Sequence, residues 1–156
     1  MYPFVFTLRK CFIHFLFYVK MSLGDDYMDC LFCKICDGSI PSNTVYEDDL
    51  VKVFLDINPN TNGHMLIVPK NHVVTVNDIN EDLAKRIIEV EKKMYALVKE
   101  KLNCEGLTIV QNNDYGQDVK HYHVHLIPRY DNDCWKMNFR QDNLKDIKDI
   151  HNTLIN

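Results

Sequence analysis

The chain has 156 residues, of which 46% are hydrophobic and 26% charged, and its net charge is −4. This length and composition predict one soluble globular domain, or one domain with a tail. The negative charge argues against broad, non-specific affinity for nucleic acid, but it is compatible with one nucleotide bound in a local pocket.

Residues 1–20 are aromatic, apolar and lightly basic, and they contain Arg9, Lys10 and His14, which make them a poor membrane span. They are either a targeting segment or an extension ahead of a start at Met21. We favour the extension and a cytoplasmic location, with organellar targeting as the alternative. We therefore predict an N-terminal extension over 1–27, disordered or targeting, a folded domain over 28–132, and a tail over 133–156.

Short apolar segments, two of which alternate with polar residues, predict five strands. Two residues separate the first two strands, so these form a hairpin. Between the third and fourth strands, Asp78 to Leu102 reads as one long helix capped by Asn80, with an apolar stripe at helical spacing. These elements predict an α+β fold, a five-stranded antiparallel sheet with one long helix. The expected strands are 44–47, 50–56, 64–68, 107–111 and 119–129, and a short helix follows near 144–154.

His121, His123 and His125 alternate with Tyr122 and Val124. In a strand this spacing places the three imidazoles on one face and the apolar residues on the other. A neutral imidazole can serve as a nucleophile toward phosphorus, a proton carrier or a metal ligand. We interpret His123 as a nucleophile with His125 as its hydrogen-bond or proton donor. Metal ligation and simple exposure on a strand are the alternatives.

Three of the six cysteines, Cys30, Cys33 and Cys36, fall within seven residues. We prefer metal binding in a reducing compartment to a disulfide framework. Cys30 and Cys33 have the spacing of a zinc knuckle, but so do Cys33 and Cys36, so the spacing leaves the register open. Reduced, metal-free cysteines are the other reading.

The chain from Cys30 to about Tyr130 resembles the histidine-triad (HIT) superfamily. The resemblance rests on the histidine motif and on blocks that precede it in the expected order. It is closest to the Hint branch, particularly to microbial members with an N-terminal Cys-x-x-Cys. The matching blocks are Phe54-Leu55-Asp56-Ile57, Gly63 to His72, Gly116 to Val119, and His121 to Ile127.

The resemblance implies a role for each matching residue. His123 is the nucleophile, His125 contacts the phosphate and assists the leaving group, and His64 supports them. Asp56 binds the ribose hydroxyls. Asn112 and Gln117 supply amides near the phosphate, whereas Asp118 stands where many relatives have a small hydroxyl residue, so that only its backbone N–H is expected to help. The expected base pocket consists of Phe32, Ile35, Phe54 and Ile57.

The resemblance also implies a structural zinc ion held by Cys30, Cys33, His72 and His121, with no metal needed for catalysis. It implies a homodimer joined through the long helix and the strand before the histidines. The function it implies is hydrolysis of purine nucleoside 5′-phosphoramidates, or similar nucleoside monophosphate conjugates, through a nucleotidyl-histidine. The alternatives are cleavage of dinucleoside polyphosphates and a nucleotide-binding or interaction module with incidental activity. We expect neither nucleic acid nor a membrane as a partner.

Overall fold

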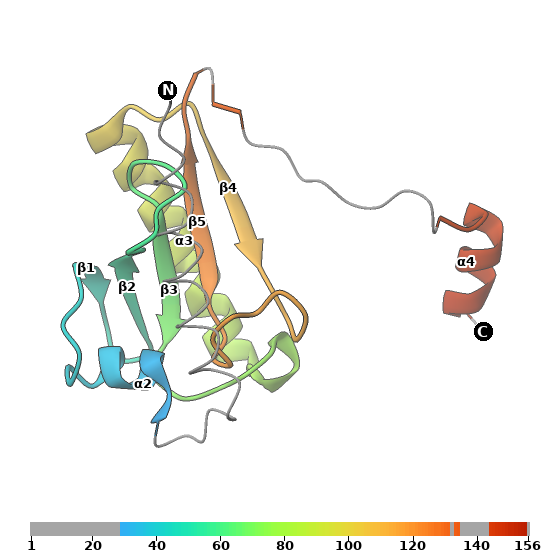
Figure 1. Ribbon diagram of the computed structural model, residues 1–156, viewed down its shortest axis with the longest axis horizontal. Coiled ribbons are helices and arrows are strands. Elements are labelled where there is room, and N and C mark those ends of the chain that lie inside the picture. Colours follow the sequence, from blue (N-terminus) through green and yellow to red (C-terminus); the bar gives the residue numbers. More distant parts are fainter. Residues whose placement is uncertain (1–28, 132, 135–143, 156) are drawn as a thin grey trace, which may run out of the picture.

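The computed structural model describes residues 29–131, 133–134 and 144–155. The expected N-terminal extension and part of the expected C-terminal tail lie outside these residues. The described chain forms a five-stranded antiparallel sheet in the order β1-β2-β3-β5-β4, as the sequence predicts (Figure 1). The strands are β1 (Thr44–Glu47), β2 (Val51–Leu55), β3 (Met65–Pro69), β4 (Gly106–Gln111) and β5 (Val124–Arg129).

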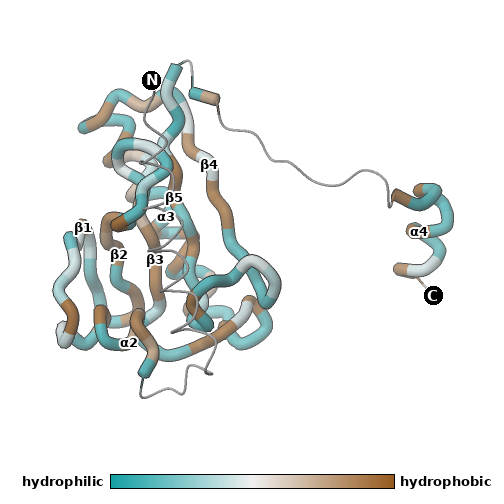
Figure 2. Tube along the Cα trace, viewed as in Figure 1, coloured by the Kyte–Doolittle hydropathy of each residue, from teal (hydrophilic) through white to brown (hydrophobic). Residues whose placement is uncertain are grey.

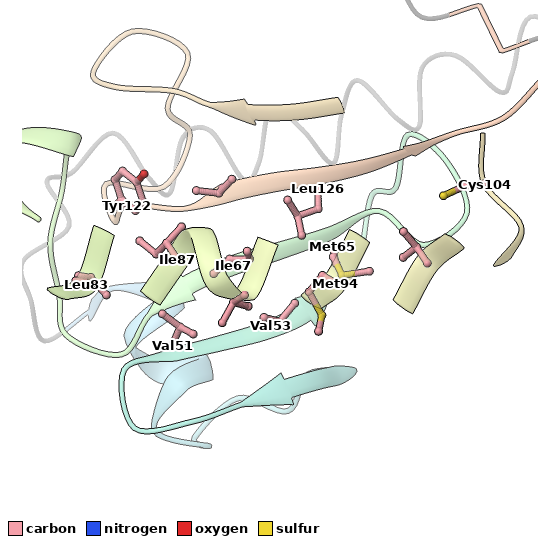
Figure 3. Packing of buried hydrophobic residues seen from close by; sticks show 13 residues of the cluster. Val51, Val53, Met65, Ile67, Leu83, Ile87, Met94, Cys104, Tyr122 and Leu126 are labelled. Carbon is pink, nitrogen blue, oxygen red and sulfur yellow. The ribbon is translucent and has the colours of Figure 1, made fainter. Parts of the chain in front are cut away.

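The helix α3 (Glu81–Leu102) covers one face of the sheet and builds the main core with it (Figure 3). Asn80 caps α3, since its side chain accepts a hydrogen bond from the backbone N–H of Leu83. The expected start at Asp78 is early, because Val76–Asp78 forms a separate 3-10 turn closed by a Thr75 capping box. The helix residues that are fully buried against the sheet are Leu83, Ile87, Val90, Met94 and Val98.

The opposite face of the sheet carries a helix that the sequence analysis missed, α2 (Leu31–Cys36). Its Phe32 and Ile35 pack with Phe54 of β2 and with two residues of β3, Leu66 and Val68. Both faces of β2 and β3 are therefore buried. This second layer brings the cysteine-rich segment against the sheet.

The histidine segment is extended over a shorter length than predicted. Strand β5 begins at Val124 rather than near Val119, because Tyr122 N–H bonds to the carbonyl of Val73, outside the sheet. The expected alternation of side chains nevertheless holds. Tyr122, Val124 and Leu126 belong to the core under α3, and Phe32 of α2 packs against the rings of His121 and His123.

A short helix near the C-terminus, α4 (Ile147–Ile155), confirms the predicted one with bounds shifted by a few residues. Apolar and polar residues alternate along it (Figure 2), and its apolar side chains are exposed. Among the described residues, the helices are too short or too polar to cross a bilayer.

Candidate active site and metal centre

Three side chains meet where β2 ends and β3 begins, next to β5, which pairs with the other edge of β3. Asp56 follows β2, His64 precedes β3, and His125 lies within β5 opposite Leu66. The Nε2 of His64 lies 3.0 Å from the Nδ1 of His125. One carboxylate oxygen of Asp56 lies 3.6 Å from the first of these atoms and 3.8 Å from the second. The fold thus assembles three predicted site residues into one cluster.

The hydrogen bonds of this cluster assign its protons. The backbone N–H of Asn60 donates to the Nδ1 of His64 at 3.2 Å. A neutral imidazole carries its proton on the other nitrogen, so the Nε2–H of His64 donates to the Nδ1 of His125. His125 therefore carries its own proton on Nε2, as a hydrogen-bond donor.

His123 has the opposite arrangement. Its Nδ1–H donates to the backbone carbonyl of His121 at 2.7 Å, which leaves a lone pair on Nε2. The Nε2 of His123 makes no hydrogen bond within the described residues, and it is not among their fully buried unpartnered atoms, of which Oε1 of Gln117 is the only one. This Nε2 therefore keeps some contact with solvent, although His123 as a whole is only 4% exposed. The rings of His123 and His125 are neighbours, with centroids 5.0 Å apart.

The imidazoles of this site are held neutral. Burial, followed by the neighbouring His123 and His64, lowers the pKa of His125 to about 4. Burial also lowers the pKa of His64, although the Asp56 carboxylate opposes the shift. The pKa of His123 is lowered by burial as well, against the hydrogen bond to His121. Neutral rings at pH 7 are what a nucleophile needs.

The Asp56, His64 and His125 atoms are close enough to hold a metal ion, but their protons argue against one. A histidine bound to metal through Nε2 must carry its proton on Nδ1 and donate it to an acceptor. The Nδ1 of His64 instead receives the N–H of Asn60. We therefore interpret His64 and His125 as a hydrogen-bonded pair that carries protons beside the Asp56 carboxylate.

The loop before the histidines presents one of its predicted amides and uses the other internally. The Asn112 side chain makes no hydrogen bond within the described residues and faces Gly116, whose positive φ of 81° suits glycine. The Nε2 of Gln117 donates to the carbonyl of Val74 at 2.6 Å, so this buried side chain anchors the loop. Asp118 is exposed, and its negative charge acts on His123.

The residues expected to form the base pocket divide into two groups. Phe32 and Ile35 of α2 are buried together with Phe54 of β2. The Phe32 ring lies edge-on to the His123 ring, with their centroids 5.1 Å apart. Ile57, in contrast, is 81% exposed and belongs to neither core cluster. The first group forms a wall beside His123, and Ile57 is available to a ligand.

The second cluster brings together the four predicted metal ligands, Cys30, Cys33, His72 and His121. Cys30 precedes α2 and Cys33 lies within it, while the two histidines come from the segments after β3 and before β5. The Sγ of Cys30 lies 3.4 Å from the Nδ1 of His121, and that of Cys33 lies 3.3 Å from the Nδ1 of His72. Tetrahedral zinc with ordinary bond lengths separates sulfur and nitrogen ligands by about 3.5 Å.

The donors also suit a metal chemically. The Nε2–H of His121 donates to the carbonyl of Pro69 at 2.9 Å, which leaves Nδ1 free to bind metal. Cys36 is outside the set and donates to the same carbonyl at 3.7 Å. The structure therefore favours the Cys30–Cys33 register that the spacing left open. No pair of cysteines among the described residues forms a disulfide.

A family model described as the HIT domain matches residues 37–132. The chain belongs to the HIT family. An uncharacterized HIT-like protein of Methanocaldococcus jannaschii is 42% identical to it over 123 residues, which are 78% of this chain and 95% of the relative. An adenosine 5′-monophosphoramidase of Candida albicans is 39% identical over 111 residues, 67% of this chain and 73% of the relative.

Solved HIT structures share the fold. A HIT family protein from Bacillus anthracis matches with a TM-score of 0.71 and 37% identity, covering 81% of this chain and 92% of its own. A zinc-bound histidine-triad protein from Mycobacterium smegmatis matches with a TM-score of 0.67 and 32% identity, covering 75% and 86%. The expected family and HIT fold are thereby confirmed.

Sequence reasoning identified the site side chains but missed the backbone groups that orient them. Three backbone groups determine which ring nitrogen of a histidine carries the proton: the N–H of Asn60 and the carbonyls of His121 and Pro69. The carbonyl of Val74 fixes the side chain of Gln117. No residue pattern marks these groups, because every residue supplies them.

Proposed function

We propose that this HIT protein hydrolyses purine nucleoside 5′-phosphoramidates, or similar nucleoside monophosphate conjugates, through a nucleotidyl-histidine. One observation carries the proposal. Two adjacent imidazoles present complementary atoms, a lone pair on the Nε2 of His123 and a proton on the Nε2 of His125. A nucleophile beside a hydrogen-bond donor is what substitution at phosphorus requires.

In the first step the Nε2 lone pair of His123 attacks the α-phosphorus, and a phosphorus–nitrogen bond forms. The bond to the leaving amine breaks, and the amine takes up a proton through His125, whose side chain is 21% exposed to water. In the second step water attacks phosphorus, its proton leaves through His125, and the bond to His123 breaks. The products are the free amine and the nucleoside monophosphate.

The remaining residues bind the nucleotide in this proposal. The Asp56 carboxylate accepts hydrogen bonds from the ribose hydroxyls. Its Oδ1 already accepts the N–H of Asn58, which fixes its orientation. Asn112 and the backbone N–H of Asp118 approach the phosphate, Gln117 holds their loop, and Ile57 covers the base against the wall of Phe32, Ile35 and Phe54. The likeness to an adenosine 5′-monophosphoramidase supports adenosine as the nucleoside.

A turnover panel tests the proposal. Wild type and His123→Ala are offered adenosine and guanosine phosphoramidates and dinucleoside polyphosphates, and the nucleoside monophosphate released is measured. We expect wild type to prefer the phosphoramidates and His123→Ala to lose at least about 10³-fold in kcat. Wild type denatured during turnover at alkaline pH, where a phosphorus–nitrogen bond to histidine survives, should contain a nucleotide covalently bound to His123. Faster cleavage of dinucleoside polyphosphates than of phosphoramidates by wild type would support the alternative hydrolase. Equally slow turnover by wild type and His123→Ala would contradict the enzyme proposal and favour a nucleotide-binding module.

Zinc bound by Cys30, Cys33, His72 and His121 completes the proposal as a structural ion. Four protein ligands leave no open coordination position for substrate. The reduced thiols that these ligands require support a reducing compartment such as the cytoplasm.

We also propose that the protein is a homodimer joined through α3 and β4. β4 is an edge of the sheet, and it exposes Ile109 by 48%, while α3 exposes Ile88 by 55%. An open edge with apolar side chains favours pairing with a second copy. Analytical ultracentrifugation should show that wild type is a dimer and that Ile109→Lys is a monomer. A monomeric wild type would contradict the proposal.

A further inference from the structure

Lys52 is a charged residue on a strand whose two faces are both buried. It is 8% exposed, and alternation along β2 puts it on the same face as Phe54, which packs against α2. Burial of an ammonium group costs free energy unless the group is paired and hydrogen-bonded. Its partners therefore indicate what a lysine does at this position.

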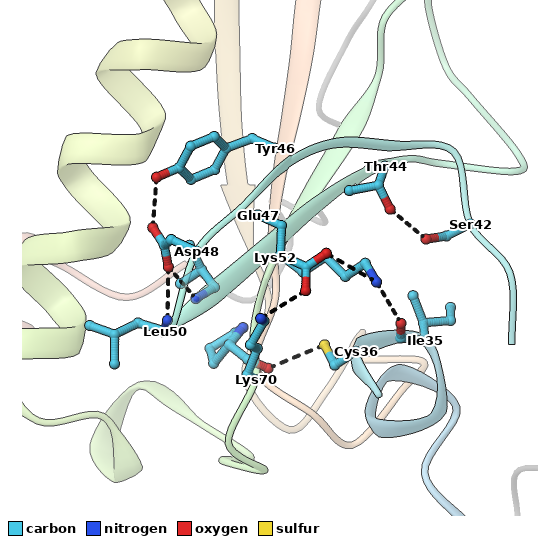
Figure 4. A network of polar contacts seen from close by, with 12 residues as sticks. Ile35, Cys36, Ser42, Thr44, Tyr46, Glu47, Asp48, Leu50, Lys52 and Lys70 are labelled. Atoms are coloured by element: carbon cyan, nitrogen blue, oxygen red, sulfur yellow. Dashed lines mark hydrogen bonds and ion pairs between the residues drawn. The ribbon is translucent and has the colours of Figure 1, made fainter. Parts of the chain in front are cut away.

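The ammonium group of Lys52 is bonded to the C-terminal end of α2. Its Nζ donates to the carbonyl of Ile35 at 3.0 Å, and it lies 3.5 Å from the carboxylate of Glu47. Glu47 is paired in turn with Lys70 at 2.7 Å (Figure 4). The backbone after α2 already donates N–H groups to the carbonyls of Cys33, Lys34 and Ile35. Lys52 adds a charged donor to the last of these from the neighbouring sheet, and a cation at this end of a helix is favourable.

The helix α2 needs such support because it has only six residues. A helix of this length is not stable alone in water. Its N-terminal end carries Cys33 and follows Cys30, both at the metal centre, and its Phe32 contacts the His123 ring. Any tilt of α2 would move a metal ligand and the wall of the nucleotide pocket together.

We propose that Lys52 is a positioning residue: by holding the C-terminal end of α2, it sets the place of Cys33 at the metal centre and of Phe32 beside His123. The part of this inference that concerns metal affinity rests on the proposed zinc site. The inference does not depend on which substrate the protein takes.

The test compares Lys52→Met with Lys70→Met in the full-length protein. Each change removes one of the two lysine ammonium groups that pair with the Glu47 carboxylate. Only Lys52 also donates a hydrogen bond to α2 among the described contacts. Two quantities are measured: amide hydrogen exchange across α2, and the affinity for Co²⁺ from its d–d absorption, which also reports coordination geometry. For Lys52→Met we expect exchange in α2 about tenfold faster and Co²⁺ affinity about tenfold weaker, as for a lost charged hydrogen bond. Lys70→Met should match wild type.

The melting temperature separates positioning from general support. Methionine fills the space of the lysine stem without a buried charge, so Lys52→Met should melt no lower than wild type. Unchanged exchange and Co²⁺ affinity in folded Lys52→Met would overturn the inference, and so would losses that merely follow a lower melting temperature. If wild type binds no Co²⁺, the zinc proposal fails and hydrogen exchange alone decides the role of Lys52.

Discussion

The chemistry of each histidine is decided by what its second ring nitrogen contacts. His121 donates to Pro69 and leaves Nδ1 open, His123 donates to a carbonyl and leaves a lone pair on Nε2, and His64 accepts from Asn60 and donates toward His125. Chemically identical side chains thereby present different atoms, which suits the different roles proposed for them. A backbone group that sets a tautomer matters as much as the side chain it touches.

At the same scale, the lowered pKa values of His64 and His125 predict how stability depends on pH. In the unfolded chain both rings take up protons near pH 6.5, whereas the folded pKa of His125 is about 4. The unfolded state therefore binds more protons between these values, so the free energy of unfolding should fall as pH drops from about 6.5 toward 4. Urea unfolding at several pH values measures this.

The matched variant for this test is His125→Gln, which removes one titrating ring from the site. Its pH dependence over the same window should be shallower than that of wild type. Parallel curves for the two proteins would show that His125 is not held neutral in the fold.

At the scale of elements, the β1–β2 hairpin is closed by one carboxylate. Asp48 accepts the N–H groups of Leu50 and Val51, the hydroxyl of Tyr46 and the Nε–H of Arg86 on α3. Although burial raises it, these hydrogen bonds lower the pKa of Asp48 to about 2. The turn and the tie between sheet and helix therefore depend on one ionised group.

Asp48→Asn should reduce the free energy of unfolding by about 2 kcal/mol at pH 7, because the amide keeps one acceptor and loses the other. The contribution of Asp48 is present above its unfolded pKa near 3.8 and is lost as pH falls toward 2. The difference between the two proteins should shrink over that range. A difference that stays constant down to pH 2 would contradict the assignment.

The elements also show what sequence patterns can and cannot predict. Helix α3 was predictable because its apolar residues recur at helical spacing, and the strands because each is a short apolar or alternating run. Helix α2 was missed because six residues show less than two turns of periodicity, and because its apolar side chains pack against strands that are distant in the sequence.

At the scale of the whole molecule, the proposed metal centre joins segments that are far apart in the chain. Its four ligands come from before α2, from α2, from after β3 and from before β5. Removal of the metal with a chelator should lower the melting temperature by about 10 °C or more, since it releases a link among these segments. Bound zinc is counted in the same samples by atomic emission.

Cys33→Ser and Cys36→Ser provide a matched pair for the metal, since they lie one helical turn apart. Cys33→Ser should lose most of the bound zinc, whereas Cys36→Ser should keep it, because Cys36 donates to Pro69 outside the ligand set. Equal loss in both variants would assign the ion to a different set of thiols.

The alternation of side chains before and along β5 has a consequence for misfolding. Tyr122, Val124 and Leu126 pack into the core under α3, while His121, His123 and His125 serve the two functional clusters on the other side. A slip of one residue along the neighbouring strands would bury imidazoles in the core and expose the apolar set. Such an error is too costly to persist, so a molecule that completes its core has already aligned its three imidazole rings.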